Sequence, residues 1–296
     1  MRDILDVLII GAGPTGLACG IDAQNAGLKY LLVEKGCLVN SLYRYPPNMG
    51  FFTSRNLLEI GGIPFSSVNV KPTREEALEY YSSVAKLFQL KFQFNERVID
   101  VKGSNNKFLI TTEKKGVGRH TYHSRKLIVA TGYYDLPNLM NIPGENLDKV
   151  FHYYTGPYKF FQQRVAVIGG ANSAAETALD LYRHGAEVTL IHRGKKLSDT
   201  IKYWVKPDIE NRIKEGSIQA LLETNVVKIT KNKIHLQNAR NKNQFINNDF
   251  VFALTGYHPD DVLLRKFGIE VNSKTLRPNC DTKTLESNVT GIYLAG

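Results

Sequence analysis

Two stretches of the chain share one order of hydrophobic and polar positions. Residues Ile4 to Ile10 form a β-prone apolar run, typical of a strand buried on both faces, and a glycine-rich turn follows it. The helical pattern of Pro14 to Ala26 has proline near its start and Gly27 just past its end. The next buried strand is expected over Tyr30 to Val33. This order predicts a βαβ unit that opens a parallel sheet.

The same order begins again at Arg164. An apolar strand is expected over Val165 to Ile168, followed by a glycine turn, a helix that runs through Arg183, and a strand over Glu187 to Ile191. The repeat predicts a second βαβ unit. Two nucleotide-binding sites are therefore expected.

The segment between the two units changes character twice. Lys35 to Val70 is irregular, aromatic and too apolar for a disordered linker, so we interpret it as a ligand-facing loop region. Thr73 and Glu76 then have the spacing of a capping box, and an apolar stripe of helical period follows. Short β-like runs come next, at 90–94, 97–101, 108–112 and 127–130.

Composition fits a two-domain globular enzyme. The chain has 296 residues, of which 43% are hydrophobic, and this length favours two domains. The net charge of +10 comes from scattered basic residues, so we expect no nucleic-acid partner. The three cysteines are too few for a disulfide scaffold, and no apolar run is long enough to span a membrane. A cytoplasmic location without membrane attachment is expected.

The first glycine turn carries a phosphate-binding motif. It reads G-x-G-x-x-G between a strand and a helix, where glycines permit a tight turn and a close approach of the backbone to a pyrophosphate. Glu34 ends the next strand, where a carboxylate would bind ribose hydroxyls. The predicted cofactor-binding residues of this loop are Gly11, Gly13, Pro14, Thr15 and Gly16.

The second glycine turn is a variant of the first. Alanine replaces its second and third glycines, and the predicted binding residues are Gly169, Gly170, Asn172, Ser173 and Ala174. Where the first unit has Glu34, this unit has His192 and Arg193, with Lys195 shortly after. A guanidinium binds a 2′-phosphate that a carboxylate would repel, so the contrast predicts NADPH over NADH. A solvated basic turn is the alternative.

Two shorter signals follow apolar strands. Val129-Ala130-Thr131-Gly132 and Ala253-Leu254-Thr255-Gly256 are both expected where a sheet returns to the first site. Either one alone could be an ordinary turn between a strand and a loop. The duplicated βαβ unit makes the pair more specific.

With these motifs, the chain resembles the pyridine nucleotide–disulfide oxidoreductase superfamily in its thioredoxin-reductase-like branch. Glu34-Lys35-Gly36, Val39 to Tyr43, and Ser198 through Trp204 to Pro207 are similar to bacillithiol-disulfide-reductase-type flavoproteins. The resemblance implies an α/β fold of two Rossmann-like domains, with an NADPH domain (154–247) inserted into an FAD domain (1–153 and 248–296). It implies hydride transfer from NADPH to FAD and then to an acceptor.

The resemblance also carries further FAD contacts. It implies that Asn40 and Ser41 lie near the FAD phosphates and that Val98 lies near the adenine. Lys35 is a further expected cofactor-binding residue. Thr131 and Gly132 would lie along the FAD. The segment that ends at Gly296 is similar to the start of the last FAD-contacting motif, so the second part of the FAD domain is expected to be truncated.

Two departures concern thiols. Thioredoxin reductases carry Cys-x-x-Cys soon after the second glycine loop, where this chain has Ala174-Ala175-Glu176-Thr177. Bacillithiol-reductase-type proteins typically have a cysteine in the first loop, where Thr15 stands here. Cys19 and Cys37 are expected to be buried packing residues, and Cys280 has no neighbouring base. No catalytic residue is assigned, and the scattered histidines predict no metal site.

Several functions share this architecture. The favoured acceptor is a small molecule, such as bacillithiol disulfide, or a small redox protein. The alternatives are a ferredoxin or flavodoxin–NADP reductase, a flavin monooxygenase, and a non-enzymatic NADPH-binding sensor. A homo-oligomer is also expected.

Overall fold

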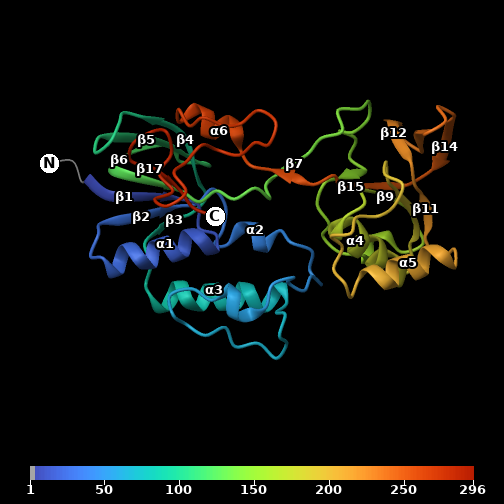
Figure 1. Cartoon of the computed structure of the whole chain (residues 1–296), viewed down its shortest axis with the longest axis horizontal. Coiled ribbons are helices and arrows are strands. Elements are labelled where there is room, and N and C mark those ends of the chain that lie inside the picture. Colours follow the sequence, from blue (N-terminus) through green and yellow to red (C-terminus); the bar gives the residue numbers. More distant parts are fainter. Residues whose placement is uncertain (1–3) are drawn as a thin grey trace. The chain divides into compact units, whose positions relative to one another are not determined.

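The computed structural model describes residues 4–296, which divide into two compact units. The first unit combines residues up to Arg44 with Met49–Leu136 and His258–Gly296, and the second contains Tyr45–Asn48 and Pro137–Tyr257. The colours of Figure 1 show that the first unit is built from both ends of the sequence. One unit is therefore inserted into the other, as the family resemblance implies.

The first unit is organised around a seven-stranded sheet. Its order is β3-β2-β1-β6-β5-β4, and β17 pairs with β6. β1 runs parallel to β2 and β6, β3 runs parallel to β2, and β17 runs parallel to β6. β4, β5 and the first half of β6 form an antiparallel meander. The strands are β1 (Ile4–Ile10), β2 (Tyr30–Val33), β3 (Phe92–Gln93), β4 (Glu96–Lys102), β5 (Phe108–Lys114), β6 (Gly118–Val129) and β17 (Ile292–Leu294).

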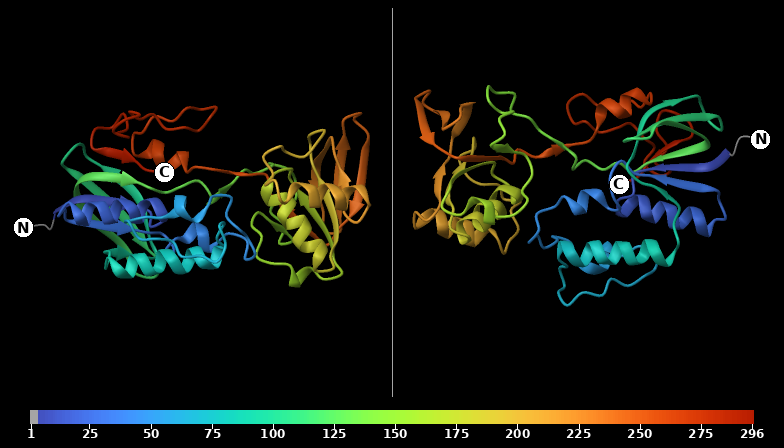
Figure 2. Two further views of the ribbon diagram at one scale, coloured as in Figure 1. Left: turned by 60° about the horizontal axis from the view of Figure 1, so that its bottom comes forward. Right: turned by 180° about the vertical axis from the view of Figure 1, so that it is seen from behind.

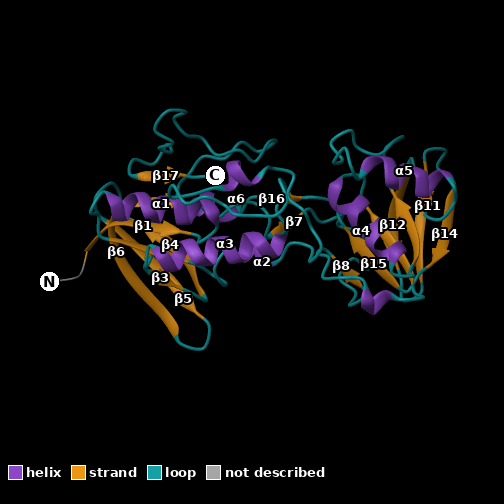
Figure 3. Cartoon of the chain, turned by 90° about the horizontal axis from the view of Figure 1, so that it is seen from below, coloured by secondary structure: helices purple, strands orange, loops and turns teal. Residues whose placement is uncertain are grey.

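Helices cover this sheet. α1 (Pro14–Asn25) connects β1 to β2 and packs against both, and α6 (Asp261–Lys266) contacts β4. α3 (Arg74–Leu87) begins with the capping box that the sequence predicts, because Thr73 Oγ1 accepts from the Glu76 amide and Glu76 accepts from the Thr73 amide. Figure 3 colours these helices purple beside the orange strands, and Figure 1 shows α1 and α3 on one side of the strands and α6 on the other.

The loop region after β2 is only partly ligand-facing, which corrects the interpretation of the whole segment. Its first part forms α2 (Asn40–Tyr43) beside the first glycine loop. Its later part packs on α3, where Tyr80 stacks on Phe65 with ring centroids 4.3 Å apart. The hydroxyl of Tyr81 also donates to the Leu58 carbonyl at 2.9 Å. Aromatic residues of this region therefore serve packing.

The second unit has a five-stranded parallel sheet of order β11-β10-β9-β15-β8. α4 (Asn172–Arg183) and α5 (Lys206–Lys214) lie on one face, and the antiparallel strands β12, β13 and β14 cover the other (Figure 2). The bounds are β8 (Val150–Phe151), β9 (Arg164–Ile168), β10 (Glu187–Ile191), β11 (Gln219–Leu221), β12 (Thr224–Ile229), β13 (Lys233–Asn238), β14 (Asn243–Asn247) and β15 (Phe250–Ala253).

The inserted unit is wider than the predicted residues 154–247. β8 and β15 fall outside that range, yet both belong to the sheet of the second unit, because β15 pairs with β9 and with β8. Tertiary pairing of two short strands, which hydrophobic pattern alone does not reveal, sets the true boundaries. The chain enters and leaves through β7 (Leu136–Pro137) and β16 (Tyr257–His258), which pair as a two-stranded sheet.

We expect Thr73→Ala to lower the free energy of unfolding by about 1 kcal/mol, because the substitution removes the side-chain cap of α3. Chemical denaturation at neutral pH measures this, with Ser83→Ala on the exposed face of α3 as control. The Thr73 amide holds the pKa of Glu76 below its usual value, so the carboxylate contributes stability above its unfolded pKa. That contribution is lost as the pH falls through the lowered pKa. An equal loss of unfolding free energy in Thr73→Ala and Ser83→Ala would contradict the capping role.

Candidate functional site

The first glycine loop joins β1 to α1 through backbone contacts that exclude side chains. Gly11 has φ +107°, and a Cβ on it would overlap the carbonyl oxygen of Ala130 at the end of β6. A Cβ on Gly16 would overlap the carbonyl oxygen of Gly11. Around Gly13, by contrast, a Cβ would meet nothing within 4 Å. Gly11 and Gly16 therefore permit strand–helix packing, while Gly13 leaves open space at the amino end of α1.

Glu34 lies at the end of β2, buried against this loop. Its side chain accepts from the Ala12 amide at 2.9 Å and from the Gly36 amide at 2.8 Å. The Ala12 carbonyl in turn accepts from the Val39 amide at 3.0 Å. The carboxylate is thus fixed at the mouth of the glycine loop, where the sequence predicts a ribose-binding group.

Asn40 supplies a polar atom that the described protein residues leave unsatisfied. The residue is 7% exposed at the start of α2, and its Nδ2 has no hydrogen-bond partner among residues 4–296. Its Oδ1 lies against Gly36, where a Cβ would overlap it. A buried amide without a partner is uncommon and suits an acceptor on a bound group. Together with the open space at Gly13, this atom makes the first site fit a dinucleotide.

Other predicted FAD-binding residues gather around the same loop. Thr131 and Gly132 follow β6 directly after Ala130, and Gly132 has φ +64° with open space around it. Gly296 lies beside Thr15, because a Cβ on Gly296 would be 3.8 Å from Thr15 Oγ1. Ser41 lies on α2, one residue after Asn40.

Val98 and Lys35 are placed differently from the loop residues. Val98 is buried in the core on β4, two residues past Glu96, whose amide donates to the Glu34 carbonyl at 2.9 Å. Lys35 Nζ forms an ion pair with Asp135 Oδ2 at 2.7 Å. A cofactor contact by the Lys35 ammonium would compete with this ion pair.

The second glycine loop repeats the contact scheme of the first. Gly169 has φ +149°, and a Cβ on it would overlap the carbonyl oxygen of Leu254 just after β15. In the same way, a Cβ on Gly11 would overlap the carbonyl oxygen of Ala130 after β6. The prediction that Ala253 to Gly256 returns to the first site is therefore wrong. β15 belongs to the sheet of the second unit, so the segment after it adjoins the second loop. Ala174 is buried at the position of the third glycine.

His192 and its neighbours form the basic turn beside this loop. The His192 ring fills the space next to Gly170 and Gly194, and burial together with Arg193 lowers the pKa of His192 below its usual value. His192 is therefore a neutral packing group near pH 7. Arg193 and Lys195 are exposed, and no carboxylate among residues 4–296 pairs with either. These two side chains supply the positive charge that the basic turn presents to solvent.

Asn172 and Ser173 begin α4. The Asn172 side chain donates to the Thr200 carbonyl at 3.0 Å and accepts from the Lys202 amide at 2.8 Å, so it supports the chain beside the loop. Sequence reasoning missed the ion pair of Lys202 with Glu176, in which Nζ and Oε1 lie 2.7 Å apart. The only signal in the sequence was a lysine between two apolar residues, Ile201 and Tyr203.

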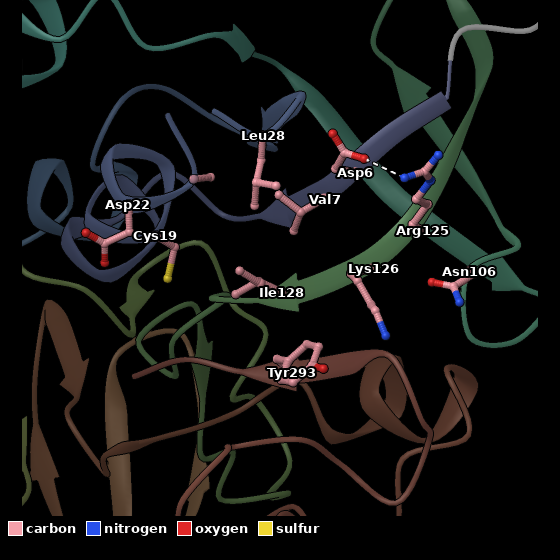
Figure 4. A pocket seen from close by; sticks show the side chains of 11 residues that line it. Asp6, Val7, Cys19, Asp22, Leu28, Asn106, Arg125, Lys126, Ile128 and Tyr293 are labelled. Carbon is pink, nitrogen blue, oxygen red and sulfur yellow. Dashed lines mark hydrogen bonds and ion pairs between the residues drawn. The ribbon is translucent and has the colours of Figure 1, made fainter. Parts of the chain in front are cut away.

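The three cysteines are free and occupy different places. Cys37 is exposed, so the prediction of burial is wrong for this residue; its sulfur lies 3.7 Å from Asn40 Oδ1. Partial burial of the sulfur still raises the pKa of the Cys37 thiol. Burial likewise raises the pKa of Cys19, which lines a mainly apolar pocket of about 480 Å³ between α1, β1, β6 and β17. Figure 4 shows Cys19 at one end of this pocket and the Asp6–Arg125 ion pair at the other.

Within residues 4–296, no cluster of three or more histidine, cysteine or acidic side chains could hold a metal ion. Over the same residues, no helix is both long and apolar enough to cross a membrane.

The fold is that of an oxidoreductase with two dinucleotide-binding units. Each unit has a glycine loop at the start of a helix, α1 or α4. The first loop lies beside a buried carboxylate and the second beside a basic turn. The chain belongs to the pyridine nucleotide-disulphide oxidoreductase family, whose model matches residues 8–296. It is therefore an FAD-dependent oxidoreductase that uses NADPH.

Individual relatives agree with this assignment. The chain is 43% identical to the bacilliredoxin reductase Bdr of Bacillus subtilis (strain 168) over 98% of its own length and 88% of that protein. The bacillithiol disulfide reductase Bdr (YpdA) from Bacillus cereus superposes with a TM-score of 0.96 at 40% identity, over 99% of this chain and 90% of that one. A thioredoxin reductase from T. acidophilum shares the fold, with a TM-score of 0.76 at 20% identity over 99% and 90% of the two chains.

We expect Gly13→Val to abolish FAD binding without disturbing the fold, because the new side chain would enter space that the protein leaves open for a phosphate. Gly16→Ala is the contrasting variant, since its Cβ would overlap the Gly11 carbonyl and destabilise the protein by about 1–3 kcal/mol. Flavin absorbance after FAD addition and denaturation of the flavin-free proteins separate the two effects. Retained FAD binding in Gly13→Val would exclude this loop as the phosphate site.

We expect Arg193→Ala to weaken NADPH binding by about 1.5–3 kcal/mol, roughly ten- to a hundredfold, through loss of a charge-assisted phosphate contact. NADH binding should change little, because NADH lacks the 2′-phosphate. Arg240→Ala, which removes the same charge from an exposed turn between β13 and β14, is the control. Titration of flavin reduction with each coenzyme gives the comparison, and a similar loss in both variants would contradict a direct contact.

Proposed function

We propose that this protein reduces a low-molecular-weight disulfide, such as bacillithiol disulfide, with electrons from NADPH. The observation that carries the proposal is the 40% identity and TM-score of 0.96 to a bacillithiol disulfide reductase over 99% of the chain. The overall reaction consumes one NADPH, one proton and one disulfide, and it yields NADP⁺ and two thiols. A bacilliredoxin protein is the second candidate acceptor, because the relative from Bacillus subtilis is a bacilliredoxin reductase.

In this proposal the first site holds FAD. Gly13 leaves room for the pyrophosphate at the amino end of α1, Glu34 accepts from ribose hydroxyls, and Asn40 Nδ2 donates to a cofactor oxygen. Thr131 and Gly132 line the same site after β6. When bound, FAD accepts two electrons as hydride from NADPH and delivers them to the acceptor.

The protein's own thiols are poorly suited to a covalent relay. A dithiol is absent after the second glycine loop, and Thr15, exposed on the first turn of α1, carries a hydroxyl that is scarcely ionised at neutral pH. Cys37 lies beside Asn40 of the first site, but the raised pKa of its thiol favours the protonated form. We therefore propose that the acceptor disulfide is reduced without a mixed disulfide to the protein.

The remaining functional classes share the fold and differ in what oxidises the reduced enzyme. A ferredoxin or flavodoxin–NADP reductase passes single electrons to a protein, a monooxygenase consumes oxygen, and a sensor shows no turnover. Anaerobic reduction by NADPH, followed by separate addition of bacillithiol disulfide, oxidised bacilliredoxin, ferredoxin or oxygen, distinguishes them. Rapid reoxidation by bacillithiol disulfide alone is the result expected, and reoxidation only by another acceptor would overturn the proposal.

A homo-oligomer and a cytoplasmic location stay predictions. Size-exclusion chromatography with light scattering of the FAD-loaded protein tests the first of them.

We expect Cys37→Ser to retain the NADPH-driven rate of bacillithiol disulfide reduction to within about twofold, because a protonated thiol is a poor nucleophile. Thr15→Cys provides the comparison, since a thiol at a helix amino terminus has a lowered pKa and can form a mixed disulfide. Mass spectrometry of enzyme quenched with the disulfide should detect an adduct in Thr15→Cys and none in the parent. A rate that collapses in Cys37→Ser, with an adduct at Cys37 in the parent, would instead identify Cys37 as the nucleophile.

A further inference from the structure

The segment Ser198–Lys202, here named the strap, is fastened across the second glycine loop and the start of α4. The Ser198 amide donates to the Gly170 carbonyl at 2.7 Å. Both polar atoms of the Asn172 side chain bind the strap, at the Thr200 carbonyl and the Lys202 amide. Ile201 is buried in the core below the strap. Four attachments within five residues give this segment a single defined path.

A partly buried ion pair holds the carboxyl end of the strap. The Lys202 side chain is 6% exposed, and its Nζ lies 2.7 Å from Glu176 Oε1 on α4. The same ammonium lies 5.8 Å from the centroid of the Trp204 ring. Removing a lysine from water is costly, and an apolar side chain could fill such a place. An ion pair with a buried lysine fits a role in fixing one conformation better than a role in adding stability.

The amino end of the strap follows shortly after the basic turn that contains His192, Arg193 and Lys195. Asp199 accepts from Lys196 Nζ at 2.6 Å and from Lys206 Nζ at 2.8 Å, and these two contacts lower the pKa of Asp199 to about 2. The strap thus joins the ion pair at Lys202 to the turn that presents Arg193 and Lys195. A shift of the strap would move the turn relative to the glycine loop.

We propose that Lys202 is a positioning residue for NADPH, whose ion pair with Glu176 holds the strap so that Arg193 and Lys195 meet the 2′-phosphate. The inference rests on the proposed use of the second site by NADPH. Lys202 does not contact the phosphate in this scheme, and it acts by fixing the groups that do. The consequence is that Lys202 governs discrimination between NADPH and NADH, beyond any effect on stability.

The test compares Lys202→Met with Lys202→Arg in the FAD-loaded protein. Calorimetry with NADP⁺ and NAD⁺ measures binding directly, and anaerobic flavin reduction gives the half-saturating concentration and limiting rate for each coenzyme. Lys202→Met keeps the side-chain length, and Glu176 is 25% exposed and can be hydrated, so the variant should fold. Arg183→Gln is the matched control, because it breaks the exposed ion pair of Arg183 with Asp208 at the other end of α4.

We expect Lys202→Met to weaken NADP⁺ binding about tenfold while NAD⁺ binding and the limiting rate change less than about twofold. Lys202→Arg should restore most of the preference, and Glu176→Gln should reproduce the effect of Lys202→Met. An unchanged ratio of NADP⁺ to NAD⁺ affinity in Lys202→Met, or an equal loss for both, would overturn the positioning role and leave the coenzyme assignment intact. Equal use of NADPH and NADH by the parent would overturn the coenzyme assignment, and this inference with it.

Discussion

Both units depend on one steric constraint, the close approach of a glycine backbone to the end of a neighbouring strand. In the first unit Gly11 lies against the Ala130 carbonyl after β6, and in the second Gly169 lies against the Leu254 carbonyl after β15. No side chain fits at either contact, and both glycines have positive φ. This contact places the amino end of α1 or α4 beside the carboxyl ends of the parallel strands. There the backbone amides and the helix dipole favour a phosphate.

What differs between the two loops is the chemistry around this shared frame. The first loop has a buried carboxylate, Glu34, held by two backbone amides, and a buried amide nitrogen of Asn40 with no protein partner in residues 4–296. The second loop has a neutral packed His192 and exposed cationic groups on the turn that follows. The frame leaves open space for a dinucleotide at the first loop, and in our proposal the side chains at the end of the second strand of each unit select which dinucleotide binds.

In the proposed scheme, coenzyme selectivity at the second loop depends on groups that touch no ligand. The strap is held by Asn172, by the glycine loop and by the Lys202–Glu176 ion pair, and it leads into the basic turn. Interactions of this kind hold the backbone next to the turn from which the exposed side chains extend. The first loop achieves a comparable fixation through Glu34 and Val39, whose contacts with Ala12 are made entirely through backbone atoms of the loop.

The sequence by itself determined the features whose causes are local. The strand–glycine–helix order, the capping box of Thr73 and Glu76, and the contrast between Glu34 and Arg193 are patterns of neighbouring residues, and the structure contains each of them. Only the tertiary structure decided that β8 and β15 join the inserted sheet, that Leu254 adjoins Gly169, that Cys37 is exposed, and that Lys202 reaches Glu176. These outcomes depend on which distant segments pack together, and hydrophobic periodicity records that a residue is buried without recording its partner.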